Sequence, residues 1–145
     1  MAAETPVRSF EIEIIAEAQV KKTESKNKVA EAVSNLFHGP GELRVEENRV
    51  QFVSEDIESL RFLRDQFRDR QVRAAARRLL LSAAKDEAKQ TFLLLNKQAA
   101  TVGIAAICDD PRESQLGPIV LRIRSERLEE AIEWITSGYS AAERS

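Results

Sequence analysis

The chain has 145 residues, 43% of them hydrophobic and 32% charged, with five glycines and four prolines. This composition is typical of one folded domain and excludes disordered, collagen-like and low-complexity chains. The formal net charge of −2 hides an uneven distribution, because residues 60–105 hold ten Lys and Arg against four Asp and Glu, between two acidic segments. A local basic surface of this kind can bind phosphate groups even in an acidic protein.

The first elements along the chain are a predicted strand and a predicted helix. Apolar and polar residues alternate within residues 7–20, which indicates a strand buried on one face. Ser25 can cap a helix whose apolar residues recur every three to four positions. This helix should end near residues 36–37, because the following His-Gly-Pro-Gly segment combines a flexible cap with a residue that cannot continue a helix.

A hairpin and a helical region are predicted next. Apolar residues at positions 43, 45, 50 and 52 flank the polar segment over residues 46–49, as in a β-hairpin. Ser54 can cap the following helix, whose apolar face extends to Phe67. A further helix is predicted over residues 72–83, and the two helices could equally be one kinked helix.

The last third of the chain predicts three strands and a helix. Residues 91–95, 102–107 and 119–123 have strand length and composition. Ser125 can cap a final helix that ends before Gly138.

The predicted order βαββααβββα indicates an α+β sandwich with a mostly antiparallel sheet and helices packed on one face. We expect a disordered tail over residues 1–6, one α+β domain over residues 7–137 and a frayed tail over residues 138–145.

Arginines dominate the helical region after residue 60. Their planar guanidinium groups suit bidentate phosphate contacts and base stacking better than lysine does, and their spacing favours one connected, exposed surface that binds a polyanion. The competing interpretation is a solvated helix face with local ion pairs, for which Asp65 and Asp69 have suitable spacing. The candidate RNA-binding residues of this region are Arg61, Arg64, Arg68, Arg70, Arg73, Arg77 and Arg78.

A second candidate lies where the strand over residues 91–95 ends. Asn96, Lys97 and Gln98 offer amide donors, amide acceptors and an ammonium group at one point of the chain. These groups suit contact with RNA. They would equally suit a turn that caps neighbouring backbone groups, and their spacing does not decide between the two.

Other sites have little support in the sequence. His38 and Cys108 stand apart from further ligands, so neither a metal site nor a cysteine–histidine pair is predicted. No glycine-rich phosphate loop is present. Two acidic pairs, at residues 109–110 and 129–130, are typical of a solvated loop and an exposed helix face. We therefore expect no catalytic residues, no metal, no cofactor and no small-molecule substrate, and no membrane-spanning segment or signal peptide, which favours a cytoplasmic protein.

Several segments resemble the archaeal uncharacterised protein family 0201 (UPF0201) over roughly residues 10–135. The likeness rests on the segments Lys22-Thr23-Glu24, Asn35-Leu36-Phe37, Leu95-Asn96-Lys97-Gln98-Ala99-Ala100, Leu116-Gly117-Pro118-Ile119 and Glu130-Ala131-Ile132-Glu133-Trp134, together with Gly39 and Gly103. The chain departs from the family in the turn at residues 38–41, where the family usually has a shorter Pro-Gly turn, and in its longer polar ends.

The resemblance implies a fold and a function class. Members of the family are grouped with predicted RNA-binding proteins, and their fold is similar to the RNA-binding core of the large-subunit ribosomal protein of the L5 type. It thus implies an archaeal protein without known catalysis whose partner is structured RNA, with ribosomal RNA as a candidate. The alternative is a protein–protein or homodimeric interaction module, in which the arginines meet an acidic surface such as the face of Glu126, Glu129, Glu130 and Glu133.

Overall fold

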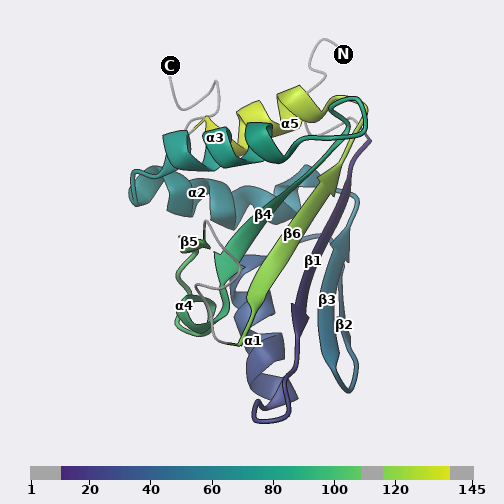
Figure 1. Ribbon diagram of the computed structural model, residues 1–145, viewed down its shortest axis with the longest axis vertical. Helices are drawn as coiled ribbons and strands as arrows, with labels where there is room; N and C mark the ends of the chain where they lie inside the picture. The colour runs from purple at the N-terminus through teal and green to yellow at the C-terminus, as the bar shows by residue number, and fades with distance from the viewer. Residues whose placement is uncertain (1–10, 109–115, 138–145) are drawn as a thin grey trace.

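The computed structural model describes residues 11–108 and 116–137 (Figure 1). Its six strands form one sheet in the order β2-β3-β1-β6-β4-β5, and every neighbouring pair is antiparallel. The α+β class and the antiparallel sheet predicted from the sequence are therefore confirmed. The strands are β1 (Glu13–Gln19), β2 (Glu42–Val45), β3 (Arg49–Ser54), β4 (Gln90–Asn96), β5 (Ile107–Cys108) and β6 (Pro118–Arg124).

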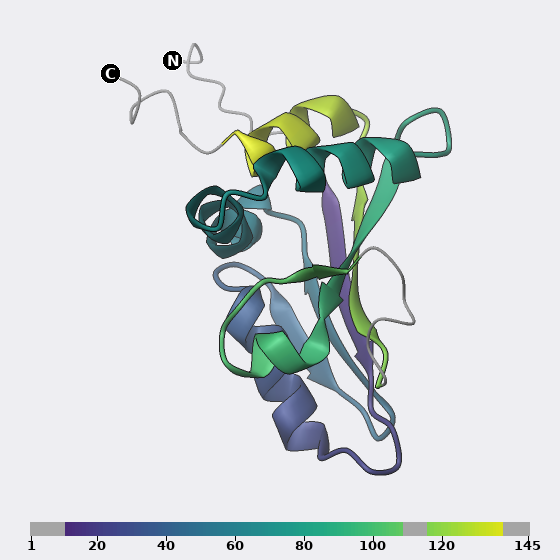
Figure 2. The same cartoon turned by 60° about the vertical axis from the view of Figure 1, so that its left-hand side comes forward.

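Helices cover one face of the sheet and one of its ends. The helical elements are α1 (Lys26–Leu36), η3 (Ile57–Leu60), α2 (Arg61–Asp69), α3 (Arg73–Ala83), α4 (Lys97–Thr101) and α5 (Leu128–Thr136). In Figure 1, α1 and α2 lie behind the sheet, and the turned view of Figure 2 places them on one side of it. The helices α3 and α5 pack against each other across one end. The opposite face of the sheet, turned toward the viewer in Figure 1, has no helix over it from residues 11–108 or 116–137, and is called the helix-free face below.

The hydrophobic core fills the space between the sheet and the helices. Side chains alternate between the two faces of a strand, so Ile14, Ala16 and Ala18 of β1 are buried on the helix side. The helices contribute residues such as Leu36 and Phe67, both fully buried. Leu79 and Leu94 are only half-buried. Leu94 lies on the other face of its strand from the buried Leu93 and Leu95.

The first helix agrees with its sequence signals. Ser25 is the N-cap of α1 and its side chain accepts a hydrogen bond from the backbone N–H of Lys28. Two other predicted caps are wrong. Asp56, and not Ser54, caps the helical segment after β3, because Ser54 is the last residue of that strand. Ser125 lies two residues before the N-cap position of α5, which is held by Arg127, and its hydroxyl accepts a hydrogen bond from the backbone N–H of that arginine.

The observed element order differs from the predicted one by two short helices, η3 and α4. The strand predicted over residues 102–107 is wrong for most of its length, since only Ile107 continues into β5. Asn96 caps α4 by accepting a hydrogen bond from the N–H of Ala99, and the small residues that follow favour a helical turn over a strand. The helices α2 and α3 are separate, because Gln71 between them has a φ of +60°.

The predicted tails over residues 1–6 and 138–145 lie outside the described residues. Within residues 11–108 and 116–137, no helix is both long and apolar enough to span a bilayer.

Candidate nucleic-acid interface

The first two arginines of the predicted surface pack toward Trp134 of α5. The side chain of Arg64 is buried, with the residue 1% exposed, and its guanidinium carbon lies 4.8 Å from the centroid of the Trp134 ring. Arg61 lies 5.7 Å from the same ring and donates two hydrogen bonds to the carboxylate of Glu58, at 2.7 and 3.0 Å. Both arginines therefore hold α2 against α5 through a cation–π stack.

Three further arginines have partners in the chain. Arg68 forms an ion pair with Asp69 at 3.1 Å and a longer one with Asp65 at 3.7 Å. Arg73 donates to the backbone carbonyl of Ser137, and Arg77 forms a 2.6 Å ion pair with Glu133 of α5. The ion pairs of Arg68 and Arg77 lie at the surface, where such pairs contribute about 0–1 kcal/mol, so they do not bind these two guanidinium groups tightly.

Two arginines of the set remain open to solvent. Arg70 ends α2 and Arg78 lies in the middle of α3, and both are exposed. Neither has a side-chain hydrogen bond or an ion pair with any residue in the described part of the chain. The sequence predicts that most of six arginines are exposed on one connected surface: Arg61, Arg64, Arg68, Arg70, Arg73 and Arg77. Only Arg70 of these six is exposed and Arg64 is buried, because the helix face that carries them also packs on α5.

Three of the four glutamates in and just before α5 pair with basic residues of the same chain. Glu133 pairs with Arg77, Glu126 with Lys89, and Glu130 with Arg127. Much of the negative surface that could meet the arginines of another molecule is thus neutralised internally.

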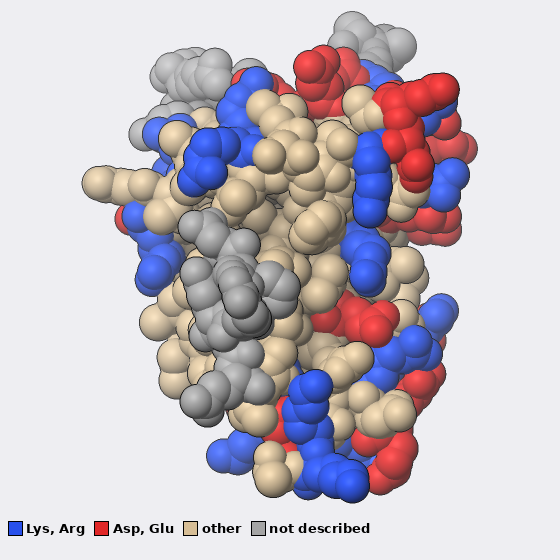
Figure 3. Space-filling view, in the orientation of Figure 1, with Lys and Arg blue, Asp and Glu red and all other residues tan. Residues whose placement is uncertain are grey.

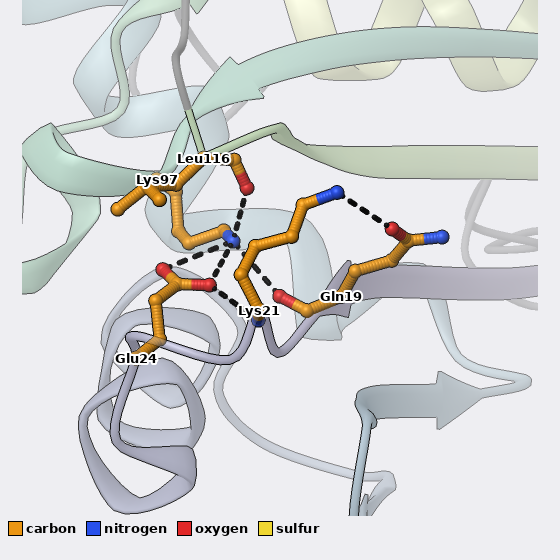
Figure 4. A network of polar contacts seen from close by, with 5 residues as sticks. All are labelled: Gln19, Lys21, Glu24, Lys97 and Leu116. Carbon is orange, nitrogen blue, oxygen red and sulfur yellow. Dashed lines mark hydrogen bonds and ion pairs between the residues drawn. The ribbon is translucent and has the colours of Figure 1, made fainter.

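Lys97 is buried at a point where four segments of the chain meet (Figure 4). Its ammonium group donates to the carboxylate of Glu24, at 3.0 and 3.2 Å, and to the backbone carbonyls of Gln19 and Leu116, at 2.8 and 2.6 Å. The side chains of Lys97 and Glu24 are 3% and 10% exposed. The lysine therefore connects the end of β1, the segment before α1, the start of α4 and the segment before β6, and its charge does not reach the surface.

The two polar neighbours of Lys97 differ from it. Asn96 is half-buried and uses its side-chain oxygen to cap α4, whereas Gln98 is exposed. The structure does not bring these residues next to the arginines: α4 packs on α1, while α3 packs on β4 and α5. The two candidate sites predicted from the sequence are separate surfaces.

Sequence reasoning missed a third polar surface, on the helix-free face of the sheet (Figure 3). Arg122 and Arg124 of β6 point to this face and are exposed, and Phe92 of β4 lies directly opposite Arg122. The alternation of residues 119–124 places both arginines on the polar side of a strand. The run over residues 91–95 does not alternate between apolar and polar residues, so the sequence does not show on which face of the sheet Phe92 lies.

A surface hollow connects this face with α3. It has a volume of about 190 Å³ and lies between the C-terminal half of α3 and β4, with Leu79, Ser82 and Ala83 on one side and Phe92 and Leu94 among the residues on the other. Cys108 of β5 also lines it and is buried. The residues that the structure describes contain no group of three or more His, Cys, Asp or Glu side chains placed to hold a metal ion.

Comparison with known proteins places the chain among archaeal relatives. It is 35% identical to a UPF0201 protein of Sulfurisphaera tokodaii, with 85% of this chain and 86% of the relative covered. A UPF0201 protein of Methanothermobacter thermautotrophicus is 34% identical, with 88% and 92% covered.

A solved structure agrees with the fold. The crystal structure of a UPF0201 protein from Methanococcus jannaschii matches with a TM-score of 0.69 and 27% identity, over 89% of this chain and 96% of that one. Residues 13–125 match a family model described as RNA binding. These matches extend over nearly all of the sheet and most of the helices, and the chain therefore belongs to the UPF0201 family, as its sequence motifs predict.

Proposed function

We propose that the chain is a non-catalytic RNA-binding protein whose partner is structured RNA. The observation that carries this proposal is the match of residues 13–125 to a family model described as RNA binding. The likeness to the RNA-binding core of the L5-type ribosomal protein, expected from the family resemblance, points in the same direction and makes ribosomal RNA the first target to test. It is an analogy of folds, so the contact residues must come from the surface itself.

The proposed contact surface for phosphates is the exposed side of the α2–α3 junction and α3. Arg70 and Arg78 are exposed and have no carboxylate partner among the described residues. Arg73 and Arg77 lie between them and are partly exposed. Because the ion pair of Arg77 is a surface pair of small energy, a phosphate can replace Glu133 as its partner. This surface, of Arg70, Arg73, Arg77 and Arg78, is called the α3 arginine surface below.

The other candidate residues take different places in the proposal. Arg61, Arg64 and Lys97 belong to the internal packing and are left out of the contact surface, as is Asn96, whose oxygen caps α4. Gln98 is exposed, and its amide can read base edges as donor and acceptor. It therefore stays as a separate position for selectivity, away from the α3 arginine surface.

The salt dependence of binding tests the proposal. Fluorescence anisotropy with a labelled ribosomal RNA fragment would measure affinity at several salt concentrations. The double variant Arg70→Gln with Arg78→Gln removes two cations. The slope of log affinity against log salt should therefore fall by about 0.7–0.9 for each phosphate that is no longer neutralised.

The matched control is Arg44→Gln with Arg49→Gln, which removes the same net charge. These arginines pair with Glu42 and Glu46, on and beside the strands β2 and β3. The control should keep a slope close to that of the parent. Equal slopes for all three proteins would show that the α3 arginine surface does not contact phosphate, and no binding to any RNA would refute the function itself.

One observation favours the alternative of a protein-interaction module. The edge strand β2 leaves Leu43 and Val45 exposed, at 38% and 44%. An exposed apolar edge strand is a place where another chain can add a strand. If this edge is an interface, Val45→Lys should lower the mass of the protein in solution, as measured by light scattering, without changing RNA affinity.

A further inference from the structure

The helix-free face of the sheet combines an aromatic ring with cations from neighbouring strands. Phe92 stands opposite Arg122 in the register of β4 and β6, and Gln90 stands opposite Arg124. Directly opposite side chains on an antiparallel pair are about 5 Å apart at Cβ, so Arg122 lies beside the ring. The ammonium group of Lys85 is 5.9 Å from the ring centroid. One cation thus lies near the half-buried ring of Phe92, and two arginines occupy the facing and the next outward position on the neighbouring strand.

The two arginines are not neutralised as others on the same sheet are. Arg44 has a carboxylate partner at 3.1 Å and Arg49 one at 3.0 Å. Arg122 and Arg124 are exposed and make no ion pair with any residue of the described ranges, although Glu13 stands opposite Arg124 on β1. The positive charge around Phe92 is therefore available to an anionic partner.

Apolar side chains extend the surface beside Phe92. Leu94 follows on β4, Val120 is its partner on β6, and Ile15 lies on the far side of Arg122. All three are on the helix-free face, and Leu94 and Ile15 are half-buried. An apolar patch bordered by arginines that pair with no carboxylate of the described residues fits a ligand with flat apolar groups joined by phosphates, which is the chemistry of a single-stranded nucleic acid.

We propose that this face is a stacking platform for single-stranded RNA, in which Phe92 stacks on a base and Arg122 and Arg124 bind the adjacent phosphates. The inference rests on the proposed RNA-binding function and adds that the RNA bound at this face is single-stranded. A base can reach the ring only when it is unpaired, since the bases of a duplex are stacked inside the helix. The platform therefore discriminates single strands from duplexes.

The platform is continuous with the α3 arginine surface. The hollow between α3 and β4 is lined by Ser82 on one side and by Phe92 on the other. Arg78 lies one helical turn before Ser82 on α3. An RNA whose duplex phosphates rest on α3 can therefore pass an unpaired segment across the hollow onto the sheet, which suits the junction between a stem and a loop.

The test compares Phe92→Leu with the parent protein on two probes. One is a single strand of about 12 nucleotides that contains 2-aminopurine, whose fluorescence reports stacking, and the other is a duplex of the same sequence. Removal of the ring should weaken binding of the single strand by about 5- to 150-fold and abolish the stacking signal. Binding of the duplex should stay close to that of the parent.

A second variant keeps the proposal testable if Phe92→Leu does not fold. Arg122→Gln changes an exposed side chain and should lower the salt slope for the single strand by about 0.7, whereas Arg44→Gln, on the same face but paired with Glu42, should leave it unchanged. If Phe92→Leu and Arg122→Gln both bind the single strand with the parental affinity and signal, the platform is wrong. In that case the RNA-binding function is still supported if the variants of the α3 arginine surface weaken binding. If neither probe binds to any of the proteins, both the RNA-binding function and the platform are refuted.

Discussion

Loss of the buried ammonium group of Lys97 should destabilise the fold far more than loss of any surface charge. Lys97→Met keeps most of the apolar stem and removes the donor. The carboxylate of Glu24 would then be left 10% exposed without its cation, and the carbonyls of Gln19 and Leu116 would lose a hydrogen bond each. The variant therefore tests whether this lysine holds four segments together.

The expected magnitude follows from the burial of the pair. Breaking a buried ion pair from one side costs about 3–5 kcal/mol, because an uncompensated charge remains in the interior. For a chain of this size, each kcal/mol lowers Tm by about 3–4 °C, so Lys97→Met should melt about 10–20 °C below the parent. Urea unfolding followed by circular dichroism would measure the free energy, and a calorimetric scan would measure the melting temperature.

Two further variants test whether the loss of stability in Lys97→Met comes from the burial of the ion pair. Arg49→Ala breaks an exposed pair with Glu46 and should cost less than about 1 kcal/mol. Adding Glu24→Gln to Lys97→Met should restore part of the stability, because it removes the isolated carboxylate charge. A Lys97→Met protein as stable as the Arg49→Ala protein would refute the structural role of the lysine.

Three further stability changes follow from the packing, each measurable by urea unfolding. Gly41→Ala should cost about 1–3 kcal/mol, because the added Cβ would overlap the ring of Phe52 and crowd the backbone carbonyl of Val53; an unchanged midpoint would refute this clash. Asn96→Ala should cost about 1 kcal/mol, because it removes the acceptor for the N–H of Ala99. Hydrogen exchange of the Ala99 amide should become faster, and unaltered exchange would show that Asn96 does not cap α4. Leu80→Ala should cost about 2–5 kcal/mol, as its side chain is fully buried, and a smaller loss would indicate that α3 collapses onto the cavity.

Local signals in the sequence predict those elements whose ends carry a capping residue or a residue that cannot continue a helix. The helix α1 has a capping serine at one end and a Gly-Pro turn at the other, and the structure ends it at Leu36 as expected. The helix α4 has no such distinct signal, because the caps of short helices resemble the polar residues of any turn. The sequence around Asn96 is therefore equally compatible with a turn between two strands.

Helical periodicity predicts which arginines are buried but not which residues they contact. Arg64 lies one turn after Leu60 and close to one turn before Phe67, so it falls inside the apolar stripe of α2. That position alone predicts burial, but the partner that makes burial favourable, Trp134, is 70 positions further along the chain. The same holds for Lys97, whose carboxylate partner Glu24 is 73 positions away. Such contacts are set by tertiary packing and leave no trace in local spacing.

The central place of β1 in the sheet has a consequence for the way the chain assembles. One edge of β1 pairs with β3, which follows within about 35 residues, whereas its other edge pairs with β6, about 100 residues later. During synthesis, α1 and the β2–β3 hairpin can therefore join β1 early, but the middle of the sheet closes only after residue 124 has left the ribosome. Pairings this distant slow folding, and until β6 arrives β1 presents an unpaired edge to other chains. A chain that terminates before Pro118 would keep that edge permanently and should aggregate.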